Sequence, residues 1–357
     1  MKQGIDRILL KEAPIKAKRI ASKLGLTRKE VNSFLHGHPE GYSQDSEFKW
    51  SLINRNELIL PTGWVTGDNF ETILREAGDL VGNDNQGIKI LFSAKCKTMI
   101  DCIARLLGLG NQLAHFGKSV TMDFADAKAT KTYLNRAGFF DHLDESIVVL
   151  PERPSESAAE KYKDQSDTLV EFGTIDTTTT NDDIIERLTN KFVQQSSVKY
   201  KIAAFTVFSE LIGNVLDHSD TPLHGFAGLQ RYRGNRKHIQ AVVSDSGDGI
   251  ANTLRPALKE HYPSLYNLYG KKSQQADIGL VKEAMKLGGI SRFGGARGLG
   301  FESSRKQAIK FNANFTVRQE KFCLDFTYEK GKLVGIKERS GLSKLLGTHI
   351  CFDFYLD

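Results

Sequence analysis

The residues best suited to chemistry gather in the C-terminal half, first on a stretch whose apolar spacing predicts a helix over roughly 197–219. Glu210, Asn214 and His218 recur every fourth residue, so they share one face of that helix. We expect the opposite face to pack on a core through four apolar residues: Phe205, Phe208, Ile212 and Val215. A carboxylate can activate an attacking group, and an amide oxygen can bind a hard cation. A polar stripe alone more often meets solvent, so this motif gains weight only from the motifs that follow it.

A second motif is a predicted strand that runs into a carboxylate and two glycines, HIQAVVSDSGDGI at 238–250. Asp245 ends the strand, and Gly247 and Gly249 let the backbone turn tightly against a flat ligand. A carboxylate fixed in this way can accept a hydrogen bond from an exocyclic amine such as that of adenine. The pattern DxGxG by itself also occurs in plain turns.

Glycine turns recur later in the chain. The segment GGARGLG at 294–300 precedes a predicted helical stretch at 301–311, and a glycine turn that enters a helix offers unpaired N–H groups to a phosphate. The sequence holds no GxxxxGK[ST], and these glycines lack the strand–helix–strand setting of a dinucleotide site, so we exclude both common phosphate loops. Near the end, Gly347 and Thr348 open a predicted strand.

The four motifs, in this order, resemble the GHKL superfamily of ATP-binding domains, to which the sensor histidine kinases and the anti-sigma-factor serine kinases belong. The resemblance covers about 170–357 and implies an α/β sandwich that binds ATP with Mg²⁺. It implies that Asn214 holds Mg²⁺, that Glu210 orients or deprotonates the attacking group, and that Asp245 binds adenine.

Further roles follow from the same resemblance. Thr348 would support an ordered water on adenine, Gly247 and Gly249 would shape the pocket, and two later glycines would contact phosphate: Gly298 and Gly300. The stretch 250–297 would form the lid over ATP. It carries four cations that could neutralise phosphate charge: Lys271, Lys272, Arg292 and Arg297.

Three activities are open for such a domain. The leading hypothesis is hydrolysis of ATP as a conformational switch in a regulatory protein. The alternative is a protein serine kinase of the anti-sigma-factor type, because the chain shows no phospho-accepting hairpin of the histidine-kinase kind. The third is an ATP-dependent scaffold without turnover, in which Glu210 is only structural.

The N-terminal block, 1–55, holds eleven Lys/Arg and six Asp/Glu, so it supplies +5 of the net charge of +6. The segment 15–38 places two predicted helices around Leu24-Gly25-Leu26-Thr27, at helix-turn-helix spacing. Its expected core residues are Ile20, Leu24, Val31 and Leu35, and the face left for DNA carries Arg28, Lys29, Asn32, Ser33 and His36. With the extended tail 45–52 as a wing, the block resembles winged-helix domains of the Z-alpha type. Arg28, Asn32 and Trp50 match the nucleic-acid contacts of that type, and His36 replaces its tyrosine. A protein-binding role is the alternative.

The central block, 56–150, is expected to alternate a strand at 88–94, a helix at 97–116, a strand at 119–124 and a helix that ends near Leu143. It loosely resembles the STAS-like fold of anti-sigma-factor antagonists, through a strand that ends in Asp123. Thr130 and Thr132 lie near the position phosphorylated in that family but do not align with it, so a protein-interaction domain is the better hypothesis. The polar, proline-bearing segment 151–170 is expected to be a linker.

Composition indicates the remaining properties of the chain, namely its relation to membranes and the role of its cysteines. No apolar run approaches the length of a membrane span, and the start of the chain lacks a signal-peptide pattern. The four cysteines lie apart and predict reduced packing residues in a cytoplasmic protein, not a metal site: Cys96, Cys102, Cys323 and Cys351. We therefore expect a multi-domain α+β protein with ATP and Mg²⁺ as ligands, with nucleic acid and a protein as candidate partners, and with a homodimer as an open option.

Overall fold

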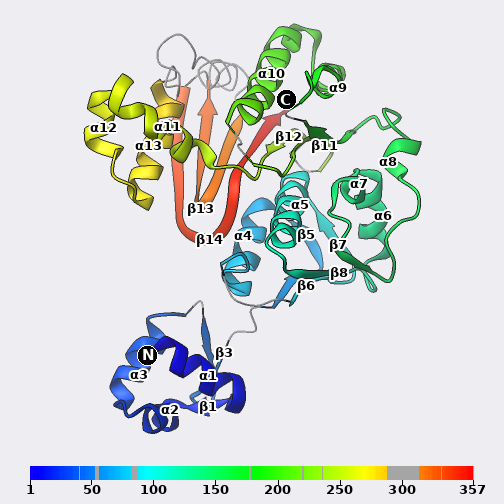
Figure 1. Cartoon of the computed structure of the whole chain (residues 1–357). Helices are drawn as coiled ribbons and strands as arrows, with labels where there is room; N and C mark the ends of the chain where they lie inside the picture. The colour runs from blue at the N-terminus through cyan, green and yellow to red at the C-terminus, as the bar shows by residue number, and fades with distance from the viewer. Residues whose placement is uncertain are drawn as a thin grey trace.

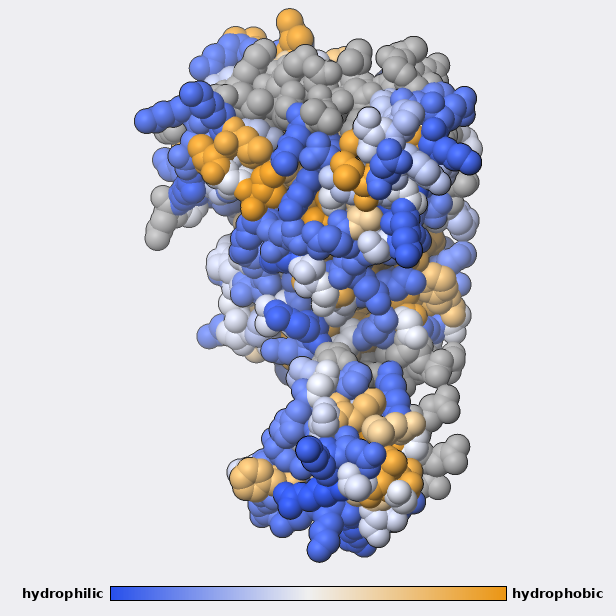
Figure 2. All heavy atoms as spheres, turned by 90° about the vertical axis from the view of Figure 1, so that its left-hand side faces the viewer, coloured by the Kyte–Doolittle hydropathy of each residue, from blue (hydrophilic) through white to orange (hydrophobic). Residues whose placement is uncertain are grey.

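The computed structural model describes residues 1–39, 41–52, 56–82, 87–176, 178–218, 221–234, 236–287, 313–330 and 332–356. Helices and strands mix in it around several separate sheets, in agreement with the expected multi-domain α and β chain. Figure 1 shows a small N-terminal lobe below two larger, closely packed parts. Figure 2 shows the same lobe from the side, with hydrophilic residues and several hydrophobic patches on its surface.

The N-terminal lobe consists of three helices and a three-stranded antiparallel sheet of order β1-β3-β2. Its elements are α1 (Lys2–Glu12), β1 (Ile15–Lys16), α2 (Ala17–Leu24), α3 (Arg28–His36), β2 (Tyr42–Gln44) and β3 (Lys49–Leu52). The predicted turn between α2 and α3 is present, because Gly25 ends α2 at φ 67° and Thr27 starts α3 with a capping box to Glu30. Ile20, Val31 and Leu35 are buried as expected, whereas Leu24 is half-buried.

The central part is built on a four-stranded parallel sheet of order β4-β6-β8-β9. These strands are β4 (Glu57–Leu60), β6 (Gly87–Phe92), β8 (Ser119–Asp123) and β9 (Val148–Leu150), and a second, parallel pair joins β5 (Gly63–Val65) to β7 (Cys96–Thr98). The helices are α4 (Gly67–Ala77), α5 (Ile100–His115), α6 (Lys128–Arg136) and α7 (Phe139–His142). The predicted strand–helix order is confirmed. The helix expected from 97 starts at Ile100, because the residues before it pair as β7, and the helix expected to reach Leu143 breaks at Gly138, which has φ 82°.

The segment 151–170 is held along its length, which differs from the expected linker. The guanidinium of Arg153 donates hydrogen bonds of 2.7 to 3.2 Å to four backbone carbonyls around α7: those of Phe140, Leu143, Asp144 and Ile147. A short helix, α8 (Ala158–Lys161), follows, and its N-cap Ser157 donates to Asp141. The last residues of the segment already belong to strand β10. Polar composition here reflects anchoring by hydrogen bonds.

The C-terminal part is a five-stranded antiparallel sheet of order β10-β11-β12-β14-β13. Its strands are β10 (Leu169–Ile175), β11 (Gly225–Tyr232), β12 (His238–Ser244), β13 (Asn314–Glu329) and β14 (Lys332–Tyr355). One face is covered by α9 (Asp182–Gln195), α10 (Lys201–His218), α11 (Gly249–His261) and α13 (Gln274–Leu287), with α12 (Pro263–Tyr269) beside them.

Both faces of this sheet are buried, because helix α5 of the central part packs on the second face (Figure 1). Alternate residues of β12 point to opposite faces of the sheet. Ala241 and Val243 therefore lie in the core under α10, and Val242 lies in the core of the central part. A buried ion pair also crosses this boundary, from Arg318 Nε to Glu71 Oε1 at 3.0 Å. The two larger parts therefore have separate cores on the two faces of this sheet and are joined across it by buried contacts.

One expectation about the helices needs correction. Phe205 is 53% exposed, although we expected it on the core face of its helix. Helix α10 starts at Lys201, and its buried stripe passes through Phe208, Ile212 and Val215, so Phe205 falls beside the stripe. The first part of the expected lid, up to residue 287, forms α11, α12 and α13, and apolar residues such as Leu258 and Val281 lie in the core.

Candidate functional site

Asp245 follows β12 directly, and its side chain is buried among backbone donors. Its Oδ1 accepts hydrogen bonds from the N–H of Gly247 at 2.8 Å and from the N–H of Thr348 at 3.3 Å. Asp245 and Thr348 are brought together by the pairing of β12 with β14, which sets Ser244 opposite His349. Burial raises the pKa of Asp245 to about 6, while the hydrogen bonds from Gly247 and Thr348 act to lower it. Asp245 is therefore protonated more readily than an ordinary aspartate.

Gly347 makes the contact between the two strands possible. It has φ +85°, and a Cβ placed on it would lie 2.0 Å from the carbonyl oxygen of Asp245. Gly249 has φ +76° and begins α11, and a Cβ there would lie 3.1 Å from Nε2 of Gln319. Both glycines of the sequence motifs thus occupy positions where a side chain would be strained or crowded.

The hydroxyl of Thr348 is oriented by a residue that sequence reasoning missed. Nε2 of Gln319, on β13, donates a hydrogen bond to Oγ1 of Thr348 at 2.9 Å. Gln319 and Thr348 are both buried, and β13 pairs Gln319 directly with Thr348. Because the Thr348 oxygen accepts from Gln319, its own proton can be donated to Asp245, and this side-chain hydrogen bond is one of those that lower the pKa of the Asp245 carboxyl. A lone glutamine in a strand carries no local signal of this role.

Glu210 and Asn214 lie one turn apart on α10, and both are half-buried. The turn after Asn214 reaches the end of β12: a Cβ on Gly225 would lie 2.8 Å from Cγ1 of Val215 and 3.1 Å from the carbonyl oxygen of Ser244. Helix α10 therefore meets the sheet next to the residue that precedes Asp245. In the described part of the chain, Nδ2 of Asn214 is buried without a hydrogen-bond partner. Buried polar atoms are nearly always paired, so this amide is suited to receive a ligand.

Of the other residues in the predicted ATP site, some lie outside the described ranges and some are exposed. Gly298 and Gly300 lie outside the described residues, as do Arg292, Arg297 and the predicted helix at 301–311, so the phosphate-binding turn stays a prediction. Lys271 and Lys272 are exposed in the turn between α12 and α13. Lys272 lines a cavity of about 260 Å³ together with Gly249 and Gln319. Of the two described lid lysines, Lys272 is thus the one in a cavity beside the Asp245 turn.

Helix α5 of the central part forms hydrogen bonds to both segments of this site. Gln112 of α5, which is fully buried, hydrogen bonds to the turn after Asp245 and to the strand before Thr348. His349 bonds to Ser244 Oγ through Nδ1 at 2.8 Å. Burial, together with the nearby Arg318 and Arg105 cations, lowers the pKa of His349 well below its ordinary value, so the ring is neutral. Sequence reasoning missed both residues, because their partners are more than a hundred positions away.

The N-terminal lobe presents the predicted nucleic-acid residues on helix α3. Arg28 and His36 are exposed and Asn32 is half-buried, at the spacing of one helix face. Trp50 instead lies in the core of the lobe, 3% exposed, with its ring centroid 4.8 Å from that of His36 in an edge-to-face contact. In this position Trp50 supports His36 from beneath. Nucleic-acid contact by α3 stays a prediction.

The threonines considered in the central part differ in access. Thr130 is buried, and its hydroxyl donates to the carbonyl of Cys96 at 2.6 Å. Thr132 is exposed, and its hydroxyl donates to the carbonyl of Lys128 at 3.0 Å. Asp123 ends β8 as expected, and its carboxylate caps the following turn through the N–H of Ala125. A partner kinase could reach Thr132 but not Thr130.

No family model and no curated protein matches the chain. The four cysteines are free and buried, which agrees with their predicted packing role. Within the described ranges, no cluster of three or more His, Cys, Asp or Glu side chains could hold a metal ion. No helix among the same residues is both long enough and apolar enough to cross a membrane.

Proposed function

We propose that the C-terminal part binds ATP at the Asp245 turn, as a switch in a regulatory protein. The observation that carries the proposal is the buried Asp245 carboxylate, which is held by Gly247 and Thr348 at the end of β12. A fixed, buried acceptor suits the exocyclic amine of adenine, since a charge-assisted hydrogen bond is strong and directional. The Thr348 hydroxyl, oriented by Gln319, is suited to hold a water on the same base edge.

The buried, unpartnered Nδ2 of Asn214 is a donor, so it is suited to an acceptor such as a phosphate oxygen, and a place for Mg²⁺ beside it is proposed from the resemblance alone. Asn214 would contribute an oxygen ligand, and the cation would neutralise phosphate charge. An amide is a ligand type that Mg²⁺ accepts, and the metal takes its remaining ligands from phosphates and water. Among the described residues, Asn214 would thus supply one ligand through its amide oxygen.

Glu210, one turn before Asn214, is suited to orient or deprotonate an attacking group. If that group is water, the protein is an ATPase that cycles between bound and hydrolysed states. If it is a serine hydroxyl of a partner, the protein is a kinase of the anti-sigma-factor type. If Glu210 is structural, the protein is a scaffold that responds to ATP without turnover. In each case α3 of the lobe is the candidate contact for nucleic acid, and the central part is the candidate contact for a protein.

Calorimetry with Mg-ATP tests the pocket. Asp245→Asn should weaken binding about 10- to 100-fold, because the adenine donor loses a charged acceptor worth roughly 1.5–3 kcal/mol. Asp248→Asn is the matched control: it removes a carboxylate from the same turn, but that side chain is exposed and caps nothing at the start of α11. Unchanged affinity in a folded Asp245→Asn protein would reject the pocket.

A second assay separates the three activities. Phosphate release is measured with ATP alone and with duplex DNA, RNA or a candidate protein added, and the same reactions are examined for labelled serine. Release of phosphate identifies the ATPase, and label on a partner identifies the kinase. Tight binding with neither product identifies the scaffold.

A further inference from the structure

The start of helix α10 carries exposed apolar side chains outside the buried stripe of that helix. Val198 lies in a 3₁₀ turn before the helix, η1 (Val198–Tyr200), and Ile202 and Phe205 lie in the first two turns of α10. The three residues are 76%, 83% and 53% exposed, and spacings of four and three residues place them along one side of the chain. We call Val198, Ile202 and Phe205 the apolar corner.

This corner is an unusual surface for a folded chain. Among the described residues, Ile202 and Val198 are the most exposed of the large apolar side chains. One exposed apolar side chain needs no explanation, whereas several side by side mark a contact surface. Because Val198 and Ile202 are exposed over most of their surface, they project outward, and they need a partner that can close around them.

Cations flank the apolar corner. Residues 190–209 hold three lysines and neither aspartate nor glutamate. Lys199 and Lys201 alternate with the apolar residues, and both are exposed. Lys199 Nζ lies 4.8 Å from the ring centre of Tyr200, so the aliphatic part of this lysine can follow the apolar surface while its charge reaches outward. The corner thus combines projecting apolar groups with positive charge.

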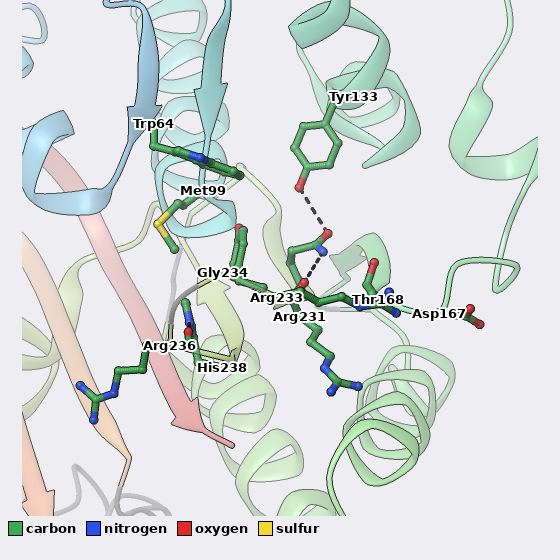
Figure 3. A pocket seen from close by; sticks show the side chains of 12 residues that line it. Trp64, Met99, Tyr133, Asp167, Thr168, Arg231, Arg233, Gly234, Arg236 and His238 are labelled. Atoms are coloured by element: carbon green, nitrogen blue, oxygen red, sulfur yellow. Dashed lines mark hydrogen bonds between the residues drawn. The ribbon is translucent and has the colours of Figure 1, made fainter. Parts of the chain in front are cut away.

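Strand β11 adds a further cation on this side of the sheet. Tyr232 bonds to the first N–H of α5, so by strand alternation Arg231 points to the opposite side, which α9 and α10 cover (Figure 3). Gln195, the last residue of α9, donates to the carbonyl of Asp167 at 2.8 Å, and the N–H of Arg231 donates to the carbonyl of Thr168 at 2.7 Å. Arg231 therefore lies near the turn that leads into the apolar corner. Asp167 is exposed there, so the excess of positive charge comes mainly from the lysines.

We infer that the apolar corner inserts into the surface of a bilayer that contains anionic phospholipids, with Lys199 and Lys201 at the headgroups. Fluid hydrocarbon can close around projecting side chains, and a bilayer surface presents phosphates on every side of an inserted group. Attachment of this kind strengthens with the apolar area buried and with attraction to anionic lipid. A corner of three apolar residues gives reversible attachment. The inference does not depend on ATP binding at the Asp245 turn.

Vesicle sedimentation tests the attachment with the full chain and without nucleotide. The parent protein should bind vesicles made of phosphatidylglycerol and phosphatidylcholine, and should not bind phosphatidylcholine alone at the same lipid concentration. Ile202→Gln, and Lys199→Gln combined with Lys201→Gln, should each weaken binding about tenfold or more. Leu268→Gln is the matched control, because Leu268 is 68% exposed on a different helix, α12.

A fluorescent label separates insertion of the corner from adsorption of the basic N-terminal lobe. The four native cysteines are buried, so a thiol introduced on the surface is the one that reacts with a nitrobenzoxadiazole label. On anionic vesicles, the label at Ile202→Cys should brighten and shift to the blue, because its surroundings become apolar. The label at Leu268→Cys should not change.

Three outcomes would overturn the inference. The first is no binding to anionic vesicles, and the second is binding that the Ile202 and lysine variants leave unchanged or that leaves the label at the corner unshifted. The third is self-association in light scattering that Ile202→Gln abolishes, without vesicle binding, which would identify the corner as a contact between copies of the chain.

Discussion

Nε2 of Gln112 donates a hydrogen bond of 2.9 Å to Oγ of Ser246, which ties helix α5 of the central part to the turn that begins with Asp245. The same amide donates to the carbonyl of Leu346 at 3.1 Å and accepts from its N–H at 2.9 Å. One buried side chain therefore fixes both backbone segments that hold the Asp245 carboxylate. The central part is a structural support of the proposed nucleotide site, and a partner that moves α5 would act on that site.

The first prediction concerns this support. Gln112→Leu should destabilise the protein by about 1–3 kcal/mol, because Ser246 and Leu346 keep buried polar groups without partners. It should also weaken Mg-ATP binding, since the turn loses its fixed position. Urea unfolding and calorimetry measure the two effects.

Asn111 supplies the matched control for Gln112. It is a neighbouring buried amide on α5, and it bonds only within the central part, to the carbonyl of His142 and the N–H of Asp144. Asn111→Ala should lower stability and leave ATP affinity intact. Equal losses of affinity in both variants would show that Gln112 has no special link to the site.

The second prediction concerns pH. Burial raises the folded-state pKa of Asp245 to about 6, above its ordinary value of 3.8, so folding favours the protonated form. The contribution to stability is complete below pH about 4 and is lost as pH rises through about 6, with a total on the order of 3 kcal/mol. The difference in unfolding free energy between the parent and Asp245→Asn, measured from pH 4 to 7.5, should show this fall. A difference that is flat with pH would contradict the burial of an ionisable group here.

The third prediction separates chemistry from binding. Glu210→Ala should keep nucleotide affinity nearly intact, because a carboxylate near phosphates contributes little to ground-state binding. It should reduce turnover by roughly 10²- to 10⁴-fold, the usual effect of a positioned general base. Asn214→Ala should instead lose Mg²⁺-dependent affinity. Steady-state phosphate release and calorimetry with and without Mg²⁺ measure these effects, and parent-like turnover in Glu210→Ala would favour the scaffold.

The fourth prediction concerns the N-terminal lobe. The full chain should bind duplex nucleic acid with an affinity that falls as salt rises, because phosphate contacts release counterions. Arg28→Ala and Asn32→Ala should weaken this binding, whereas Lys18→Ala, an exposed cation on α2, serves as the control. Fluorescence anisotropy at several salt concentrations measures it. If the α3 variants bind like the parent, or nothing binds at low salt, α3 is a protein contact.

Local signals in the sequence predicted the elements that carry the candidate site. The apolar run before Asp245 predicted β12, and the glycines after it marked a turn that other residues could not form, since Gly249 has a positive φ. Helix caps did the same for the lobe, where Thr27 and Glu30 start α3. Such signals are readable because the atoms that interact lie within a few residues of one another.

Only the tertiary structure decided which distant residues complete the site. Gln112 bonds to Ser246 in the Asp245 turn, and Gln319 bonds to Thr348 beside it; both partners are many positions away, and nothing near either glutamine in the sequence marks that role. Burial was decided in the same way: Phe205 faces outward and Trp50 inward, because each depends on what packs against its element. The sequence by itself determined the motifs and their order. The sheet, buried on both faces, decided which side chains share a pocket, because contact between distant segments depends on how whole elements pack.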